Sequence, residues 1–222
     1  MENSSVFDII GPNMIGPSSS HTAGALRIAL IAGKIVNGTI KKVKFILYGS
    51  FARTYKGHGT DKALLAGILG FDTFDERIRD AFTIAKSQGL EYKFEINKTN
   101  TDNHPNTVDI IIEDNNGQVT SLTGVSIGGG KAIINKINGA DIMLTNEYNT
   151  IFVTQYDKPG VVAFITKCLS DAHVNIAFMR LFRKHKGDVA YTVIEFDEDI
   201  KEDVLQQIKS YKHILSALLI KA

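Results

Sequence analysis

The clearest fold signal begins with the stretch Thr150-Ile151-Phe152-Val153-Thr154-Gln155-Tyr156-Asp157-Lys158-Pro159-Gly160. Residues 150–156 are rich in β-branched and aromatic side chains, which is typical of a strand. Pro159 and Gly160 then mark a turn, and proline suits the first turn of a helix. Apolar residues recur after this turn with the spacing of one helix face, at Val161, Ile165, Cys168 and Leu169. The stretch therefore predicts a strand followed by a helix, with Cys168 as a small core residue.

The same alternation continues to residue 220. Segments 175–183 and 188–196 are predicted to be strands joined by a turn, 201–211 a second helix and 214–220 a last strand. The order βαββαβ predicts a ferredoxin-like α+β domain with both helices on one face of the sheet. Polar residues around Asn146 indicate a linker, so we expect two domains, 1–146 and 149–222.

The N-terminal domain is expected to be a mixed α/β sandwich, and its strand order is left open. Helices are predicted over 23–36, 62–69 and 76–88, and strands over 43–48, 92–96, 108–113 and 118–125. Asn115-Asn116-Gly117 is a hairpin turn between the last two strands. Residues 23–36 contain many small side chains, which indicates close packing of that helix.

Composition excludes several classes of protein. The chain has 222 residues, and its 25 basic residues nearly balance 24 acidic ones. Nothing in this balance would steer nucleic acid or an anionic membrane to the protein, so we expect neither as a partner. Cys168 is the only cysteine, so this chain alone cannot form a disulfide framework or hold an iron–sulfur cluster. The start resembles no signal peptide and no apolar stretch suits a membrane span, so we expect a cytoplasmic protein.

One loop concentrates hydroxyl groups at the start of a predicted helix. It contains Ser18, Ser19, Ser20, His21 and Thr22. Helix N-termini present unpaired N–H groups and a partial positive charge, which suit a carboxylate or phosphate. The alternative is that one serine only caps the helix. Capping accounts for a single hydroxyl, and both readings stay open at this point.

Two further loops carry histidines. His58 follows a predicted buried strand and is flanked by glycines, while His104 precedes Pro105 and a predicted strand. Thr60 or Asp61 is expected to cap the helix that follows His58. With His21, the two histidines could form a three-histidine zinc site, but their spacing matches no metal motif. Walker A, Rossmann and nucleophile-elbow motifs are not found.

Four motifs together resemble those of the β subunit of iron–sulfur-dependent L-serine dehydratase, also called L-serine ammonia-lyase. They are the segments 16–24, 49–61, 104–107 and 126–130. The C-terminal domain resembles an ACT domain, a small amino-acid-binding module. The resemblance implies conversion of L-serine into pyruvate and ammonia by α,β-elimination of water. It also implies a [4Fe–4S] cluster ligated by a separate α subunit, with no metal ligand in this chain.

The resemblance also implies roles for individual residues. The catalytic acid/base candidates are His21, His58 and His104. The substrate-binding candidates are Ser18, Ser19, Ser20, Thr22, Gly49, Ser50, Thr60, Asp61 and Asn106. An amino-acid effector would bind the ACT domain at Asp157, Pro159, Gly160, Val161 and Asn175. ACT domains commonly pair, so self-association is expected. The N-terminal domain also resembles a module of some phosphoglycerate dehydrogenases, which keeps a non-catalytic serine-sensing regulator as the alternative.

Overall fold

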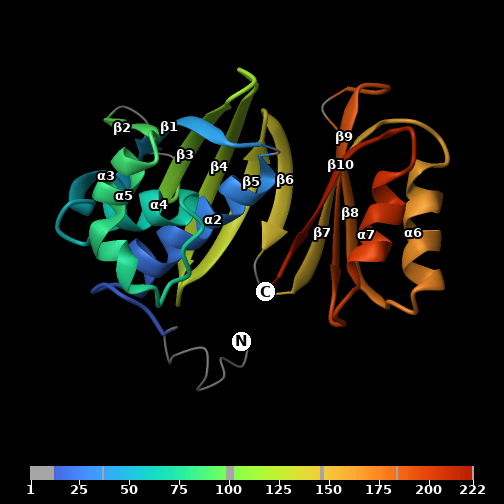
Figure 1. Cartoon of the computed structure of the whole chain (residues 1–222), viewed down its shortest axis with the longest axis horizontal. Coiled ribbons are helices and arrows are strands. Elements are labelled where there is room, and N and C mark those ends of the chain that lie inside the picture. The colour runs from blue at the N-terminus through green and yellow to red at the C-terminus, as the bar shows by residue number, and fades with distance from the viewer. Residues whose placement is uncertain (1–12, 37, 99–102, 146–147, 184, 222) are drawn as a thin grey trace. The chain divides into compact units, whose positions relative to one another are not determined.

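The chain folds into two compact units, Met1–Asn138 and Gly139–Ala222 (Figure 1). The computed structural model describes residues 13–36, 38–98, 103–145, 148–183 and 185–221. Residues 146 and 147, at the expected domain boundary, lie outside the described residues, and the boundary stays a prediction. Within the described ranges, no helix has the length and apolar character needed to cross a membrane.

The first unit is a helix-covered sheet, as the α/β expectation required. Its helices are η1 (Ser19–Gly24, a π-helix), α2 (Ala25–Ile35), α3 (Gly49–Thr54), α4 (Thr60–Ile68), η2 (Glu76–Asp80, a 3₁₀ helix) and α5 (Ala81–Ser87). Its strands are β1 (Ile40–Leu47), β2 (Glu91–Ile96), β3 (Thr107–Asp114), β4 (Val119–Gly128) and β5 (Lys131–Ile137). Within this unit the strands follow the order β2-β1-β3-β4-β5.

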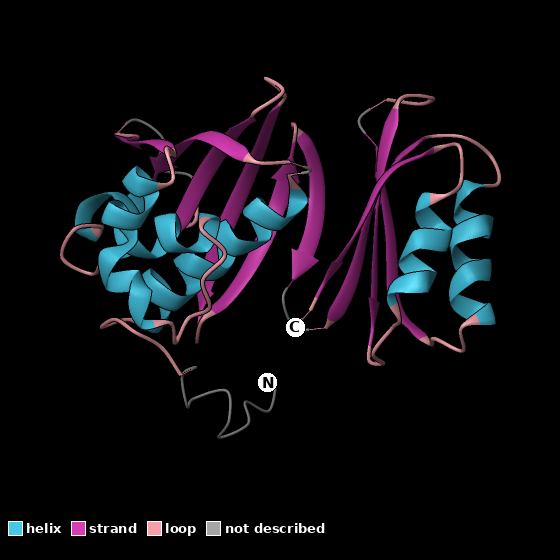
Figure 2. Cartoon of the chain, in the orientation of Figure 1, coloured by secondary structure: helices cyan, strands magenta, loops and turns pink. Residues whose placement is uncertain are grey.

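One face of this sheet carries the helices (Figure 2). β1 pairs with β2 in parallel, and the pairs β1–β3, β3–β4 and β4–β5 are antiparallel. Apolar side chains alternate along the strands, so that Phe45 and Ile110 are fully buried together with Leu26 of α2. The core therefore lies between the sheet and α2, and η1 is held at the edge of that core.

Glycine allows close approach at two points of this packing. A Cβ on Gly67 of α4 would overlap the carbonyl oxygen of Leu26 in α2. A Cβ on Gly24, at the end of η1, would overlap Oγ of Ser126 in β4. The small residues of segment 23–36 thus have the packing role that the sequence indicated.

Several predicted boundaries in this unit are wrong. The helix expected over 76–88 is divided into η2 and α5, and β5 was not predicted because its apolar residues are interrupted by Lys136 and Asn135. Residues 49–54, interpreted as loop, form the short helix α3. Residues 126–128 end strand β4, and only the glycine turn 128–130 is irregular, with φ values of 101°, 59° and 80°.

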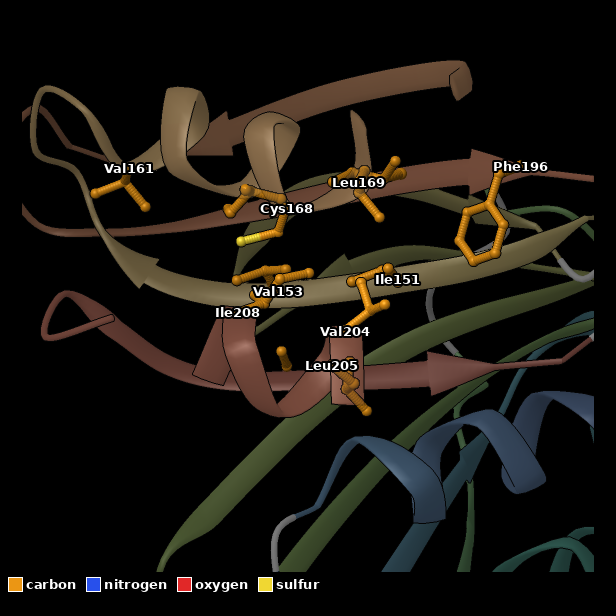
Figure 3. Close-up of a cluster of buried hydrophobic side chains, with 12 residues drawn as sticks. Ile151, Val153, Val161, Cys168, Leu169, Phe196, Val204, Leu205 and Ile208 are labelled. Atoms are coloured by element: carbon orange, nitrogen blue, oxygen red, sulfur yellow. The ribbon is translucent and has the colours of Figure 1, made fainter. Parts of the chain in front are cut away.

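The second unit confirms the ferredoxin-like prediction. It begins with β6 (Ala140–Thr145), a strand that was not predicted. The predicted elements follow as β7 (Asn149–Tyr156), α6 (Val161–Asp171), β8 (Ile176–Arg183), β9 (Val189–Phe196), α7 (Glu202–Lys209) and β10 (Ile214–Ile220). An antiparallel sheet has the order β10-β7-β9-β8, and α6 and α7 cover one face of it (Figure 2). Cys168 lies in the apolar cluster beneath these helices, as predicted (Figure 3).

The α2–α4 contact gives a matched pair of glycine substitutions. We expect Gly67→Ala to destabilise the chain by about 1–3 kcal/mol, because its Cβ would overlap backbone of the neighbouring helix. A Cβ on Gly33 would meet Ile68 only at ordinary contact distances of 3.6–3.7 Å. Gly33→Ala should therefore be neutral or stabilising by up to ~1 kcal/mol. Urea unfolding of the full chain measures both changes, and equal effects would contradict this packing.

Candidate active site

The N-terminal loop is built around a cap on η1. Ser18 is extended, with φ −143° and ψ 123°, and its Oγ accepts a hydrogen bond of 3.1 Å from the backbone N–H of His21. One serine is therefore a helix cap, as the simpler interpretation required. Ser19 and Ser20 are half-buried and are not needed for that cap. Their hydroxyls remain available for another role at the same helix start.

His21 connects this loop to the second one. Its Nε2 lies 2.8 Å from Oγ of Ser50, and its Nδ1 lies 3.3 Å from Oγ of Ser18. The imidazole of His58 is an edge-on neighbour, with 4.8 Å between the ring centroids. Two of the three predicted histidines therefore lie side by side, with hydroxyl groups around one of them.

The environment of His21 favours its neutral form. Burial lowers the pKa of the His21 imidazole below its usual value, and the charge of His58 lowers it further. Two imidazoles this close resist carrying two protons at once. Both effects favour the neutral imidazole of His21, which is the form that accepts a proton.

Hydrogen bonds to backbone carbonyl groups bring the three loops together. Oγ1 of Thr22 donates a 2.9 Å hydrogen bond to the carbonyl oxygen of His58. The N–H of Ser50 donates a 2.7 Å hydrogen bond to the carbonyl oxygen of Pro105. Gly49 has a φ of +48°, and a Cβ there would lie 2.7 Å from Cα of Pro105. Only glycine fits this contact between the second and third loops.

The helix after His58 is not capped as predicted. Gly59, with φ 65°, occupies the N-cap of α4, and no side chain caps this helix. Thr60 is fully buried, and its Oγ1 has no hydrogen-bond partner among the described residues. Asp61 accepts a hydrogen bond from the N–H of Lys62, and burial raises the pKa of its carboxyl group.

His104 differs from the other two histidines in its exposure to solvent. It is exposed, and its Nδ1 accepts a 3.2 Å hydrogen bond from the N–H of Asn106. Among the described residues, its ring does not pack against the ring of His21 or His58. In the described part of the chain, no three His, Cys, Asp or Glu side chains are grouped as a metal site requires.

Sequence reasoning omitted Ser126 from the candidate side chains. Its Oγ is buried beside Gly24 and has no partner in the described residues. Nδ1 of His58 and Oδ1 of Asn106 are also buried without partners in this part of the chain. Buried polar atoms are normally paired with protein, ordered water or a ligand, so these atoms mark a polar region next to η1. The sequence signal for Ser126 was its place at the start of motif 126–130, beside the glycine turn.

The five predicted effector residues do not meet within one chain. Oδ2 of Asp157 accepts hydrogen bonds from Nη1 of Arg183 at 2.7 Å and from the N–H of Gly187 at 2.9 Å. Gly160 begins α6 with φ 87°. β7 and β8 are both antiparallel to β9, so Asp157 follows the end of β7 while Asn175 precedes the start of β8. The two residues therefore lie at opposite ends of the sheet.

The fold and site define a two-unit protein, with paired histidines among hydroxyl groups in the first unit and a ferredoxin-like second unit. Residues 5–136 match the family described as serine dehydratase beta chain, and residues 149–213 match the ACT domain family. The chain belongs to the serine dehydratase beta chain family and carries an ACT domain.

Curated relatives agree with this assignment. The chain is 43% identical over 97% of both chains to a probable L-serine dehydratase, beta chain, of Bacillus subtilis. It is 39% identical over 98% of both chains to L-serine dehydratase, beta chain, of Peptoniphilus asaccharolyticus. It is also 34% identical to L-serine dehydratase of Streptomyces coelicolor, where the match covers 64% of this chain and 36% of that longer one.

The histidine pair gives a spectroscopic prediction. In an NMR pH titration of the chain, the His21 ring should titrate below its usual value of 6.5, because burial and His58 both disfavour the imidazolium. His58→Gln should raise the midpoint while leaving it below 6.5, since burial is the larger cause. His185→Ala, an exposed turn residue, is the control and should change nothing. A His21 midpoint at or above 6.5 in the unsubstituted chain would contradict the described environment.

Proposed function

We propose that this chain is the β subunit of a two-chain L-serine dehydratase, which converts L-serine into pyruvate and ammonia. The observation that carries the proposal is the His21–His58 pair among serine hydroxyls, in a chain whose full-length relatives are named as beta chains of that enzyme. The longer Streptomyces relative supports a second subunit, because the matched region is only 36% of that single chain. The remainder of such a chain corresponds to a separate α subunit here.

The reaction requires two bonds of serine to break. A base removes the proton on Cα, the C–O bond of the side chain breaks and the hydroxyl leaves as water. The resulting enamine then hydrolyses to pyruvate and ammonia. A weakly acidic proton and a poor leaving group must both be assisted, and the substrate must be held in one conformation.

The cluster implied by the family would have to come from the α subunit. Cys168 is the only thiol of this chain and lies in the apolar core of the second unit. The residues around His21 offer hydroxyls, amides and imidazoles, which suit an amino acid better than a cluster of iron and sulfide. When bound, a [4Fe–4S] cluster with an open iron supplies a Lewis acid for the leaving hydroxyl.

This chain would supply the proton chemistry and the carboxylate site. A neutral imidazole of the His21–His58 pair would take the Cα proton, and Ser50 and Ser18 would orient His21. Hydroxyls of Ser19 and Ser20 would donate to the substrate carboxylate. Thr22, Gly49, Thr60, Asp61 and Asn106 lie in or next to the same three loops and stay substrate-binding candidates. His104 is retained as an acid/base candidate on the exposed rim.

Histidine variants test this proposal in the assembled enzyme. We expect His21→Ala and His58→Ala each to lower kcat for pyruvate formation by 10²–10⁴-fold, the usual range for general acid–base groups. The chain would be co-expressed anaerobically with the α subunit, and cluster content measured by absorbance. His185→Ala is the control with unchanged kcat, and His104→Ala is assayed in parallel. If both His21→Ala and His58→Ala turn over normally, the pair is not the base, and an inactive wild-type complex with a full cluster would favour a serine-sensing module.

The pH profile provides a second readout of the same experiment. The base must be unprotonated, so kcat should fall as the pH is lowered through the pKa of the histidine pair. Because the pKa of His21 is lowered, this acid limb should lie below 6.5. A limb at or above 6.5 would remove neutral His21 from the proton-transfer step.

We also propose that the ACT domain pairs with a second copy through β8. This strand is at the edge of its sheet and exposes the apolar side chains of Phe178 and Leu181. Antiparallel pairing of two β8 strands about a two-fold axis would bring Asn175 of one chain to the Asp157 turn of the other. The predicted effector residues, separated within one chain, would then form one amino-acid site.

Opposite edges of the sheet allow a matched test. Leu181→Lys on β8 should weaken self-association of the full chain, because it introduces like charges across the two-fold axis. Leu215→Lys on β10, the other edge strand, replaces a similarly exposed leucine and should leave association unchanged. Sedimentation velocity over a concentration series measures both. A wild-type chain that stays monomeric at high concentration, or equal effects of the two variants, would contradict pairing through β8.

A further inference from the structure

Thr22 uses its hydroxyl proton inside the protein. This residue of η1 is 2% exposed, and its Oγ1 donates a 2.9 Å hydrogen bond to the carbonyl oxygen of His58. A hydroxyl group carries one proton and therefore donates one hydrogen bond at a time. While this bond is made, Thr22 has no proton left for a substrate carboxylate. Its burial and its bond to His58 both argue for a role other than direct contact with the substrate.

The side chain of Thr22 is held in one orientation by its surroundings. Gly16 has a φ of +126°, and a Cβ there would lie 2.4 Å from Cγ2 of Thr22. The methyl group thus occupies space that a side chain at Gly16 would need. The N–H of Thr22 also donates a 2.9 Å hydrogen bond to the carbonyl oxygen of Ser18. Because a β-branched side chain has few χ1 rotamers, this packing keeps the hydroxyl directed at His58.

His58 depends on its backbone for its position. Gly57 and Gly59 flank it, and glycine has more conformational freedom than any other residue. The N–H of His58 donates a 3.0 Å hydrogen bond to the carbonyl oxygen of Thr54, which lies just before the same turn. Nδ1 of the His58 ring is buried and has no partner among the described residues. The bond from Thr22 therefore ties this turn to another element, η1.

The same bond lies where the two imidazoles meet. Thr22 directly follows His21 in η1, and the ring centroids of His21 and His58 are 4.8 Å apart. A hydrogen bond from residue 22 to the backbone of His58 therefore fixes the separation of the two rings. Without this bond, the flanking glycines would allow His58 to move away from His21.

We propose that Thr22 is a positioning residue, which holds His58 beside His21 by donating a hydrogen bond to the His58 carbonyl oxygen. The inference rests on the proposed function, in which the histidine pair takes the Cα proton. It narrows that function, because Thr22 leaves the set of substrate-binding candidates and acts through His58. Direct binding of the substrate by Thr22 predicts a raised KM on its removal, whereas positioning predicts a lowered kcat with little change in KM.

Two substitutions separate the hydroxyl of Thr22 from its methyl group. Thr22→Val keeps the branched shape packed at Gly16 and removes the donor, whereas Thr22→Ser keeps the donor and removes the methyl group. In the assembled two-chain enzyme, Thr22→Val should lower kcat for pyruvate formation by about 10- to 100-fold, the effect of a small misplacement in an active site. KM should stay close to that of wild type, and Thr22→Ser should retain most of the activity. Thr166→Val is the matched control, since it removes a threonine donor to a backbone carbonyl oxygen in α6 and should leave kcat unchanged.

An NMR pH titration of the full chain detects the position of His58 without the α subunit. His58 is the group whose charge lowers the pKa of His21. Thr22→Val should therefore raise the His21 midpoint toward that of His58→Gln, and Thr22→Ala, which also lacks the donor, should do the same. Combining Thr22→Val with His58→Gln should give no further rise, because both changes remove one interaction. Thr22→Ser should leave the midpoint at its wild-type value.

Several results would overturn the inference and leave the proposed function standing. They are a wild-type kcat in Thr22→Val, a raised KM with unchanged kcat, equal losses in Thr22→Val and Thr22→Ser, and additive midpoint shifts of Thr22→Val and His58→Gln. A wild-type complex that forms no pyruvate from L-serine would overturn the proposed function. The titration would then still decide whether Thr22 holds His58 beside His21.

Discussion

The site depends on the close contact between Gly24 and Ser126. With no Cβ at Gly24, the end of η1 lies directly against β4, and α2 continues from it over the sheet. This contact fixes the position of the turn that carries Ser18, His21 and Thr22. Each of these side chains then reaches another loop or caps its own helix. The geometry of the candidate site is thus held by backbone packing in the core rather than by the loops themselves.

The C-terminal unit could be predicted almost element by element, because its apolar residues follow strand and helix periods between clear turns. The first unit could not. Its parallel β1–β2 pair and the position of β5 depend on contacts between distant segments, which local patterns do not encode. For the site, the motifs named His21 and His58 as separate candidates and did not indicate that the two rings lie side by side. They also gave no reason to separate the exposed His104 from the pair. Motif 126–130 contains Ser126 but does not indicate that its hydroxyl is buried.

Under the proposed function, the polar groups around η1 form one part of an active site that two subunits share. Burial lowers the pKa of His21, and four buried polar atoms around η1 have no partner in the described residues, those of His58, Thr60, Asn106 and Ser126. Under the proposed function, this chain supplies the base and the hydrogen-bonding groups for the substrate. The family to which the chain belongs is named as a beta chain, which fits the same conclusion.

A crystal structure of the two-chain complex with L-serine bound would test this account most directly. It predicts the Cα of serine about 3–3.5 Å from a nitrogen of His21 or His58, the separation of a reactive conformer. The carboxylate should lie at Ser18–Ser20, and the leaving hydroxyl should point toward the other subunit. Serine bound away from η1, with both imidazoles facing solvent, would contradict it.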